Sequence, residues 1–88
     1  MRLLVKGQVQ SVGFRWFVKN NARALAITGW VRNLTDGSVE IKAQGAPAAL
    51  AELSQLIQAG NSRCQVDELL ELHEHEGVAD DDGIKISF

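Results

Sequence analysis

The stretch 27–44, ITGWVRNLTDGSVEIKAQ, decides the fold. Its second half, residues 38–44, alternates apolar with polar side chains, which is the pattern of a half-buried strand. Its first half, residues 27–34, is largely apolar and reads as a partner strand. Between them, Asp36-Gly37 is a strong hairpin signal, because both residue types tolerate the positive φ of tight turns. We therefore expect a β-hairpin over residues 27–44.

The residues before this hairpin predict a strand, a loop and a helix. Residues 1–9 contain the apolar run Leu-Leu-Val and predict a short, largely buried strand. Residues 7–13, GQVQSVG, predict a compact loop whose flanking glycines permit positive φ and a close backbone approach. From Phe14 onward, apolar residues recur every three or four positions and predict a helix that stops before Gly29.

The residues after the hairpin predict a second helix and at least one more strand. Pro47 is expected as the first residue of a helix that is closed by Gly60. Residues 64–75 fit either a helix face or a strand, and the pattern leaves both open. Residues 84–88 alternate plainly and predict a last strand after the acidic loop 77–83.

The resulting order β-α-β-β-α-β, with a possible extra short strand, is typical of the split βαβ arrangement. We expect one α+β domain over residues 1–88, a ferredoxin-like sandwich with two helices on one face of an antiparallel sheet. The first helix returns the chain to a second strand that is parallel to the first, and the third strand lies between them. The ends of the first two strands should therefore lie at one edge, roughly 10 Å apart. Arg15 and Asn33 should face each other there.

The composition excludes several classes of function. Nine Lys and Arg against eleven Asp and Glu give a formal net charge of −2, which does not favour nucleic acid as a partner. The single cysteine, Cys64, can form neither an intramolecular disulfide nor a cysteine-based zinc site, so we expect a cytoplasmic protein. The apolar runs are too short for a membrane span, and no signal peptide is evident.

The loop that leads into the first helix has the features of an anion site. The first N–H groups of a helix have no partner within the helix, and the helix dipole adds partial positive charge there. Arg15, in the first turn, could add a bidentate fork for phosphate or carboxylate oxygens. These features alone are also compatible with a tight turn followed by a surface arginine.

Two longer motifs carry a resemblance to a known family. GQVQSVGFR at residues 7–15 and TGWVRNLTDGSVE at residues 28–40 closely resemble the paired motifs of the acylphosphatase family. The resemblance spans the chain and implies hydrolysis of the carboxyl–phosphate anhydride of small acyl phosphates, without metal or cofactor. It also implies a phosphate-binding site formed by Gln10, Ser11, Val12, Gly13, Phe14 and Arg15.

The resemblance further implies that Asn33 orients the attacking water, and Arg15 and Asn33 are thus the expected catalytic residues. The neutral amide of Asn33 cannot take a proton at neutral pH, so it can act only by orienting water. Ser11 departs from the family pattern, which usually has glycine there, and positive φ at that position would strain the loop. We expect a monomer.

Two other functions remain as alternatives. The alternatives are a non-catalytic module of the same fold that binds phosphate or carbamoyl phosphate, and an RNA-binding domain of the same topology, which would need a basic surface.

Other polar and aromatic residues are expected to have structural roles. We expect solvated rather than metal-binding side chains at residues 73–76 and at the triple aspartate 80–82, and a buried Cys64. Trp30 is expected in the core, while Trp16 either walls the site or covers the sheet edge.

Overall fold

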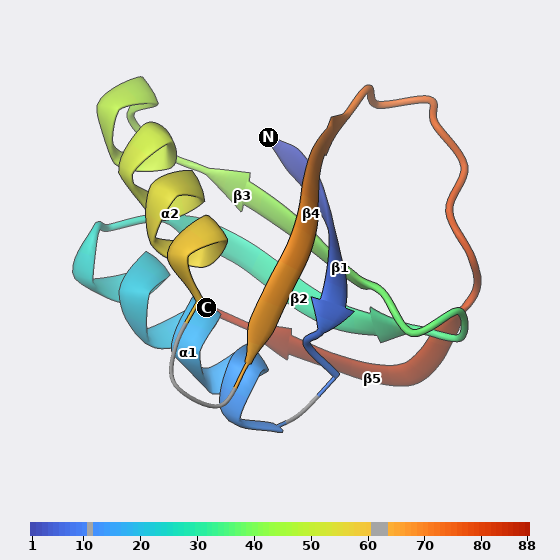
Figure 1. Cartoon of the computed structure of the whole chain (residues 1–88). Coiled ribbons are helices and arrows are strands. Elements are labelled where there is room, and N and C mark those ends of the chain that lie inside the picture. The colour runs from blue at the N-terminus through green and yellow to red at the C-terminus, as the bar shows by residue number, and fades with distance from the viewer. Residues whose placement is uncertain (11, 61–63) are drawn as a thin grey trace.

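The computed structural model describes residues 1–10, 12–60 and 64–88, which form a sheet with two helices (Figure 1). The elements in chain order are β1 (Arg2–Gln8), α1 (Val12–Ala24), β2 (Thr28–Leu34), β3 (Val39–Gln44), α2 (Pro47–Ala59), β4 (Gln65–Leu72) and β5 (Asp81–Ser87). The expected order β-α-β-β-α-β is confirmed, with one additional strand. No helix in the described part of the chain is long and apolar enough to span a membrane.

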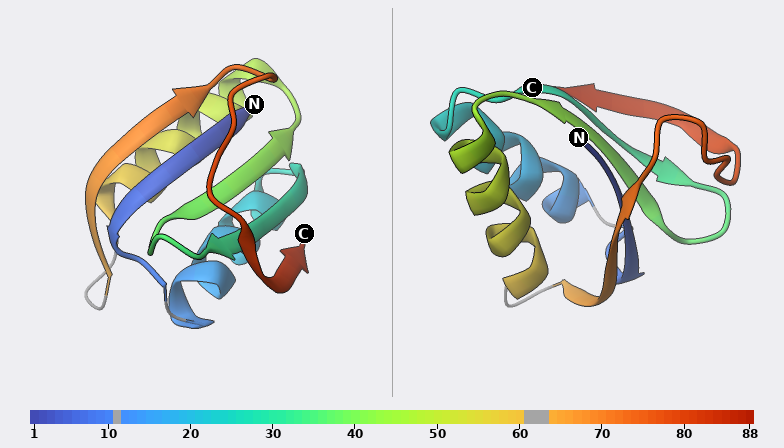
Figure 2. Two further views of the ribbon diagram at one scale, coloured as in Figure 1. Left: turned by 90° about the vertical axis from the view of Figure 1, so that its right-hand side faces the viewer. Right: turned by 90° about the horizontal axis from the view of Figure 1, so that it is seen from above.

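The sheet has five strands in the order β4-β1-β3-β2-β5, and every neighbouring pair is antiparallel. Both helices lie on one face (Figures 1 and 2). β3 is inserted between β1 and β2, as the split βαβ arrangement predicts. The register puts Val5, Val39 and Asn33 in one row across these three strands. This row brings the ends of β1 and β2 to the same edge of the sheet.

The core fills the space between the sheet and the helices. Alternate strand residues point toward the helices. The helices pack against them with apolar residues that recur every three or four positions. The fully buried members (under 2% exposed) are Leu3, Val5, Val9, Phe14, Val18, Ala22, Val31, Val39, Ile41, Ala43, Leu53 and Ile57. This packing fixes α1 against β2 and β5, and with it the residues of its first turn.

The boundaries differ from the expected ones where long-range pairing decides them. The ambiguous residues 64–75 form a strand, because β4 pairs with β1 along the whole length from Arg2 to Gln8. β5 begins at Asp81, three residues before the expected start, because Asp81 pairs with Leu34 across a bulge in the sheet. The first helix, α1, begins at Val12 rather than Phe14.

The expected glycine-flanked loop at residues 7–13 is shorter than predicted. Gly7 lies inside β1, with φ at 135° and a bulge in the β1–β4 pairing beside it. A Cβ at this position would stand 2.2 Å from the main-chain oxygen of Gln65, so the glycine serves the close approach of β4. Gly13 lies in the first turn of α1. The connection between the two elements is therefore only residues 9–11.

The turn between β2 and β3 confirms the hairpin but not its expected type. The N–H of Leu34 donates to the carbonyl of Ser38 (2.8 Å), which leaves a three-residue turn. Gly37 has φ at 94°, whereas Asp36 has negative φ, since Ala26 is the one described non-glycine residue with positive φ. A three-residue hairpin turn needs only one residue in this region, at its end.

Asp36 braces the turn through its carboxylate. Its Oδ1 accepts hydrogen bonds from the main-chain N–H of Ser38 (2.9 Å) and from the Ser38 hydroxyl. These two hydrogen bonds favour the charged form and hold the pKa of the Asp36 carboxyl below its ordinary value of 3.8. The ionised carboxylate therefore stabilises the turn that follows Asn33.

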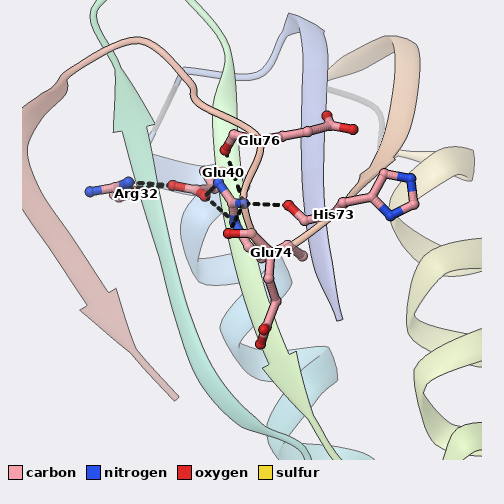
Figure 3. Close-up of polar contacts among 6 residues, drawn as sticks. Arg32, Glu40, His73, Glu74 and Glu76 are labelled. Carbon is pink, nitrogen blue, oxygen red and sulfur yellow. Dashed lines mark hydrogen bonds and ion pairs between the residues drawn. The ribbon is translucent and has the colours of Figure 1, made fainter.

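The face of the sheet away from the helices carries a buried ion-pair cluster (Figure 3). Glu40 is 1% exposed and accepts from the Nε of Arg2 (2.8 Å) and the Nε of Arg32 (2.7 Å), each arginine using a different carboxylate oxygen. The Nη1 of Arg2 also donates to the main-chain oxygens of His73 (2.8 Å), Glu74 and Glu76 (3.1 Å). The β4–β5 connection is thereby held across this face (Figure 2).

Neither tryptophan lies in the core. Trp30, expected there, is half-buried on the face away from the helices, with the guanidinium of Arg32 5.0 Å and the amine of Lys85 4.8 Å from its ring centre. These two cations favour the aromatic ring at a partly wet surface. Trp16 is 46% exposed and lies under the amine of Lys19 (4.8 Å).

Replacing Glu40 should destabilise the fold strongly. Glu40→Ala removes the carboxylate that Arg2 and Arg32 share, and breaking a buried pair in this way costs about 3 kcal/mol, the lower end of the usual range because both arginines are partly exposed. Urea unfolding measures the change. Glu52→Ala, at an exposed position of α2, is the matched control and should stay within about 0.5 kcal/mol of the wild type. A loss below about 1 kcal/mol for Glu40→Ala would contradict the role given to the cluster.

Replacing Asp36 should lower stability in a pH-dependent way. Asp36→Ala removes the acceptor of two hydrogen bonds and should lower the free energy of unfolding by about 1 kcal/mol at pH 7. Because the folded-state pKa is below 3.8, this contribution is complete above that value and is lost as the pH falls through the folded-state pKa. Urea unfolding at pH 7 and near pH 2 should show the two proteins converge in acid; a gap that is equal at both pH values would contradict this.

Candidate active site

Arg15 is a charged side chain that is buried in the described part of the chain. It follows the core residue Phe14 in the first turn of α1 and is only 7% exposed. Its Nε and Nη1 atoms are buried, and neither has a hydrogen-bond partner among the described residues. The carboxylate of Glu40 lies on the other face of the sheet, where it pairs with Arg2 and Arg32. A buried cation without a counter-charge is costly, so this guanidinium indicates a site for an anion.

Asn33 is the second buried polar group at this end of the sheet. It is 6% exposed and lies on β2 opposite Val39, in the row that also contains Val5. The alternation of the strand puts it on the helix-covered face, because Val31, two residues earlier, is in the core. Its Oδ1 is also buried without a partner among the described residues. The amide oxygen is therefore available to a hydrogen-bond donor such as water.

The start of α1 adds further positive character. The helix runs for 13 residues and has no acidic residue in its first turn, so nothing in that turn neutralises the positive end of its dipole. Its first main-chain N–H groups have no partner within the helix. Together with the guanidinium of Arg15, they form an arrangement suited to binding a phosphoryl group.

The residues expected to bind phosphate divide into two groups. Arg15, Phe14 and Gly13 lie in the first turn of α1, where Phe14 is fully buried and Gly13 is exposed. Val12 is the first residue of α1, and Ser11 lies outside the described residues, so the strain expected there is not tested.

Gln10 stands apart, because its side-chain amide already has two partners. Its Nε2 donates to the main-chain oxygens of Leu34 and Ser38, the latter at 2.8 Å. The sequence did not predict this contact. The two acceptors are main-chain oxygens 24 and 28 residues away, so no local pattern near Gln10 indicates them.

Other candidate sites receive no support from the geometry. Among the side chains that the structure describes, no group of three or more His, Cys, Asp or Glu is placed to hold a metal ion. The side chains of Asp81 and Asp82 lie outside the described part, so the expectation for the aspartates at 80–82 is not tested there. His73 and His75 are exposed, and Cys64 is buried as expected. A pocket of about 210 Å³ opens beside the turn between β2 and β3, lined by Lys6, Gly7, Asp36, Gly37 and Ser38. Its lining includes neither of the unpaired polar groups described above.

Comparison with known sequences identifies similar proteins. The sequence model of the acylphosphatase family, described as Acylphosphatase, matches residues 1–85. An acylphosphatase of Caldivirga maquilingensis is 44% identical over 89 residues, which cover 100% of this chain and 93% of that protein. An acylphosphatase of Marinobacter nauticus is 49% identical over 67 residues, which cover 76% of this chain and 73% of that protein.

Comparison with solved structures identifies proteins of the same family. The crystal structure of an acylphosphatase from Bacillus subtilis is similar with a TM-score of 0.75 and 34% sequence identity, covering 90% of this chain and 93% of that one. An acylphosphatase from Coxiella burnetii also has a TM-score of 0.75 and 34% identity, covering 90% of this chain and 84% of that one. The ferredoxin-like α+β fold expected from the sequence is thereby confirmed.

Proposed function

The chain belongs to the acylphosphatase family and hydrolyses acyl phosphates, and we propose that Arg15, Asn33 and the turn between β1 and α1 carry out this reaction. The observation that carries the proposal is the buried guanidinium of Arg15 without a counter-charge among the described residues, at the edge of the sheet where β2 presents Asn33. The non-catalytic binding module gains no support from the relatives, which are named as acylphosphatases.

Arg15 and the main-chain N–H groups of residues 10–15 hold the phosphoryl group in this proposal. The guanidinium fork matches two phosphate oxygens, and its Nε and Nη1 atoms gain partners that the described residues do not supply. The positive end of α1 faces the same anion. Charge on the three equatorial oxygens of the transition state is thus stabilised by groups that are already in place, without a metal or cofactor.

Asn33 places the attacking water. Its unpaired Oδ1 accepts a hydrogen bond from water and directs the water oxygen toward phosphorus. The bond from the water oxygen to phosphorus forms as the bond from phosphorus to the acyl oxygen breaks, and the carboxylate leaves. One water proton passes to a phosphate oxygen. Because a carboxylate is a good leaving group, positioning and charge stabilisation supply most of the catalysis.

We also propose the setting in which the protein works. The buried apolar residues that pack against one another form one cluster, which supports a single domain over residues 1–88. We propose that this domain acts as a monomer. The one cysteine, Cys64, is 5% exposed and is suited to a reducing cytoplasm.

Removing the guanidinium should abolish most activity. Arg15→Ala should lower kcat/KM for benzoyl phosphate at least about a hundredfold and weaken competitive inhibition by inorganic phosphate, because a preorganised charge is lost. Its thermal stability in phosphate-free buffer should not fall, since the Nε and Nη1 atoms of this buried charge have no partner among the described residues. Arg23→Ala, at an exposed position in the last turn of α1, is the control. Near-normal activity of Arg15→Ala would place the active site elsewhere.

Removing the amide should affect turnover rather than phosphate binding. Asn33→Ala should lower kcat about a hundredfold while the inhibition constant of inorganic phosphate changes by less than about threefold, since only water placement is lost. Asn20→Ala, at an exposed position of α1, should behave as the wild type. Weakened phosphate inhibition with unchanged kcat would show instead that Asn33 binds the phosphoryl group.

A further inference from the structure

We propose that Gln10 is a positioning residue that keeps the phosphate-binding turn aligned with Asn33, an inference that rests on the function proposed above. The family resemblance placed Gln10 among the groups that bind the phosphoryl oxygens. The structure shows its side chain occupied in a different way, against the hairpin that carries Asn33. Gln10 therefore acts on the reaction through the placement of another residue.

The carboxamide of Gln10 uses its N–H groups on one structural unit. Its Nε2 donates to the main-chain oxygens of Leu34 and Ser38. These two residues close the turn between β2 and β3: the N–H of Leu34 donates to the oxygen of Ser38 (2.8 Å), and the N–H of Gly37 donates to the oxygen of Leu34 (3.2 Å). A carboxamide –NH₂ carries two hydrogens, so both are engaged by the closing pair of this turn.

This contact joins two parts of the site that the sheet does not join directly. β1 leads into the phosphate-binding turn and β2 carries Asn33, but β3 separates the two strands. Asn33 directly precedes Leu34, whose main-chain oxygen is one of the two acceptors. Gln10 therefore connects the turn to the residue next to Asn33, whereas the path through the sheet crosses two strand pairings.

The length and chemistry of the side chain both matter to this role. A displacement of about 1 Å between reacting groups can cost about a hundredfold in rate, so a direct link between turn and hairpin has catalytic value. Glutamate has the same length as glutamine but, when ionised, has no hydrogen to donate and would meet two carbonyl oxygens. Alanine removes the link without adding this repulsion.

The first test compares the kinetics of Gln10→Ala and Gln10→Glu with those of the wild type on benzoyl phosphate. Both should lower kcat, Gln10→Ala by about tenfold or more and Gln10→Glu by more, while the inhibition constant of inorganic phosphate stays within about threefold. Gln44→Ala, exposed at the other end of β3, is the matched control and should keep normal kcat. Unchanged kcat with a lowered melting temperature would assign Gln10 a purely structural role and overturn the proposal.

The second test combines Gln10→Ala with Asn33→Ala in a double-mutant cycle. If Gln10 acts through Asn33, the double variant should have the kcat of Asn33→Ala alone, within about threefold. Effects that multiply would overturn the proposal, as would a loss at Gln10 that appears mainly in phosphate inhibition, because the side chain of Gln10 would then touch the substrate. These outcomes differ from failure of the proposed function, which would appear as an inactive wild type or an active Arg15→Ala.

Discussion

A guanidinium buried without a counter-ion is the constraint on which the site depends. Moving a cation out of water costs several kcal/mol unless an anion accompanies it, and the described residues offer Arg15 none. The fold supports this arrangement because Phe14, the preceding residue, is fixed in the core and holds the first turn of α1 in place. An arriving phosphoryl group therefore meets a charge that is already oriented and already desolvated.

The two faces of the sheet treat buried charge in opposite ways. On the outer face, Glu40 is satisfied twice over, by Arg2 and by Arg32, and the cluster contributes to holding the β4–β5 connection in place. On the helix-covered face, Arg15 and Asn33 have buried polar atoms with no partner among the residues that the structure describes. The ion-pair cluster around Glu40 stabilises the sheet. The buried polar atoms of Arg15 and Asn33 lower the stability of the folded protein and are kept for function. Both groups lie on strands or helices that the core positions, so each geometry is rigid.

The sequence predicted the parts of this structure that depend on local patterns. The hairpin with Gly37, the helix that starts at Pro47 and the insertion of β3 between β1 and β2 follow from periodicity and topology. Features that depend on distant partners were not predictable. The strand β4 needed β1 to decide it, and charged Glu40 reads as a solvated residue until two arginines are placed beside it.

The connection between β1 and α1 lies between two residues that are fixed by close packing. Gly7 lies so close to the backbone of β4 that a single added carbon would collide with it, and Phe14 is enclosed by the core. One inserted residue would lengthen the chain between these anchors by about 3.8 Å and would displace the residues between them. Evolution can therefore exchange side chains along this segment far more readily than it can change the number of residues in it.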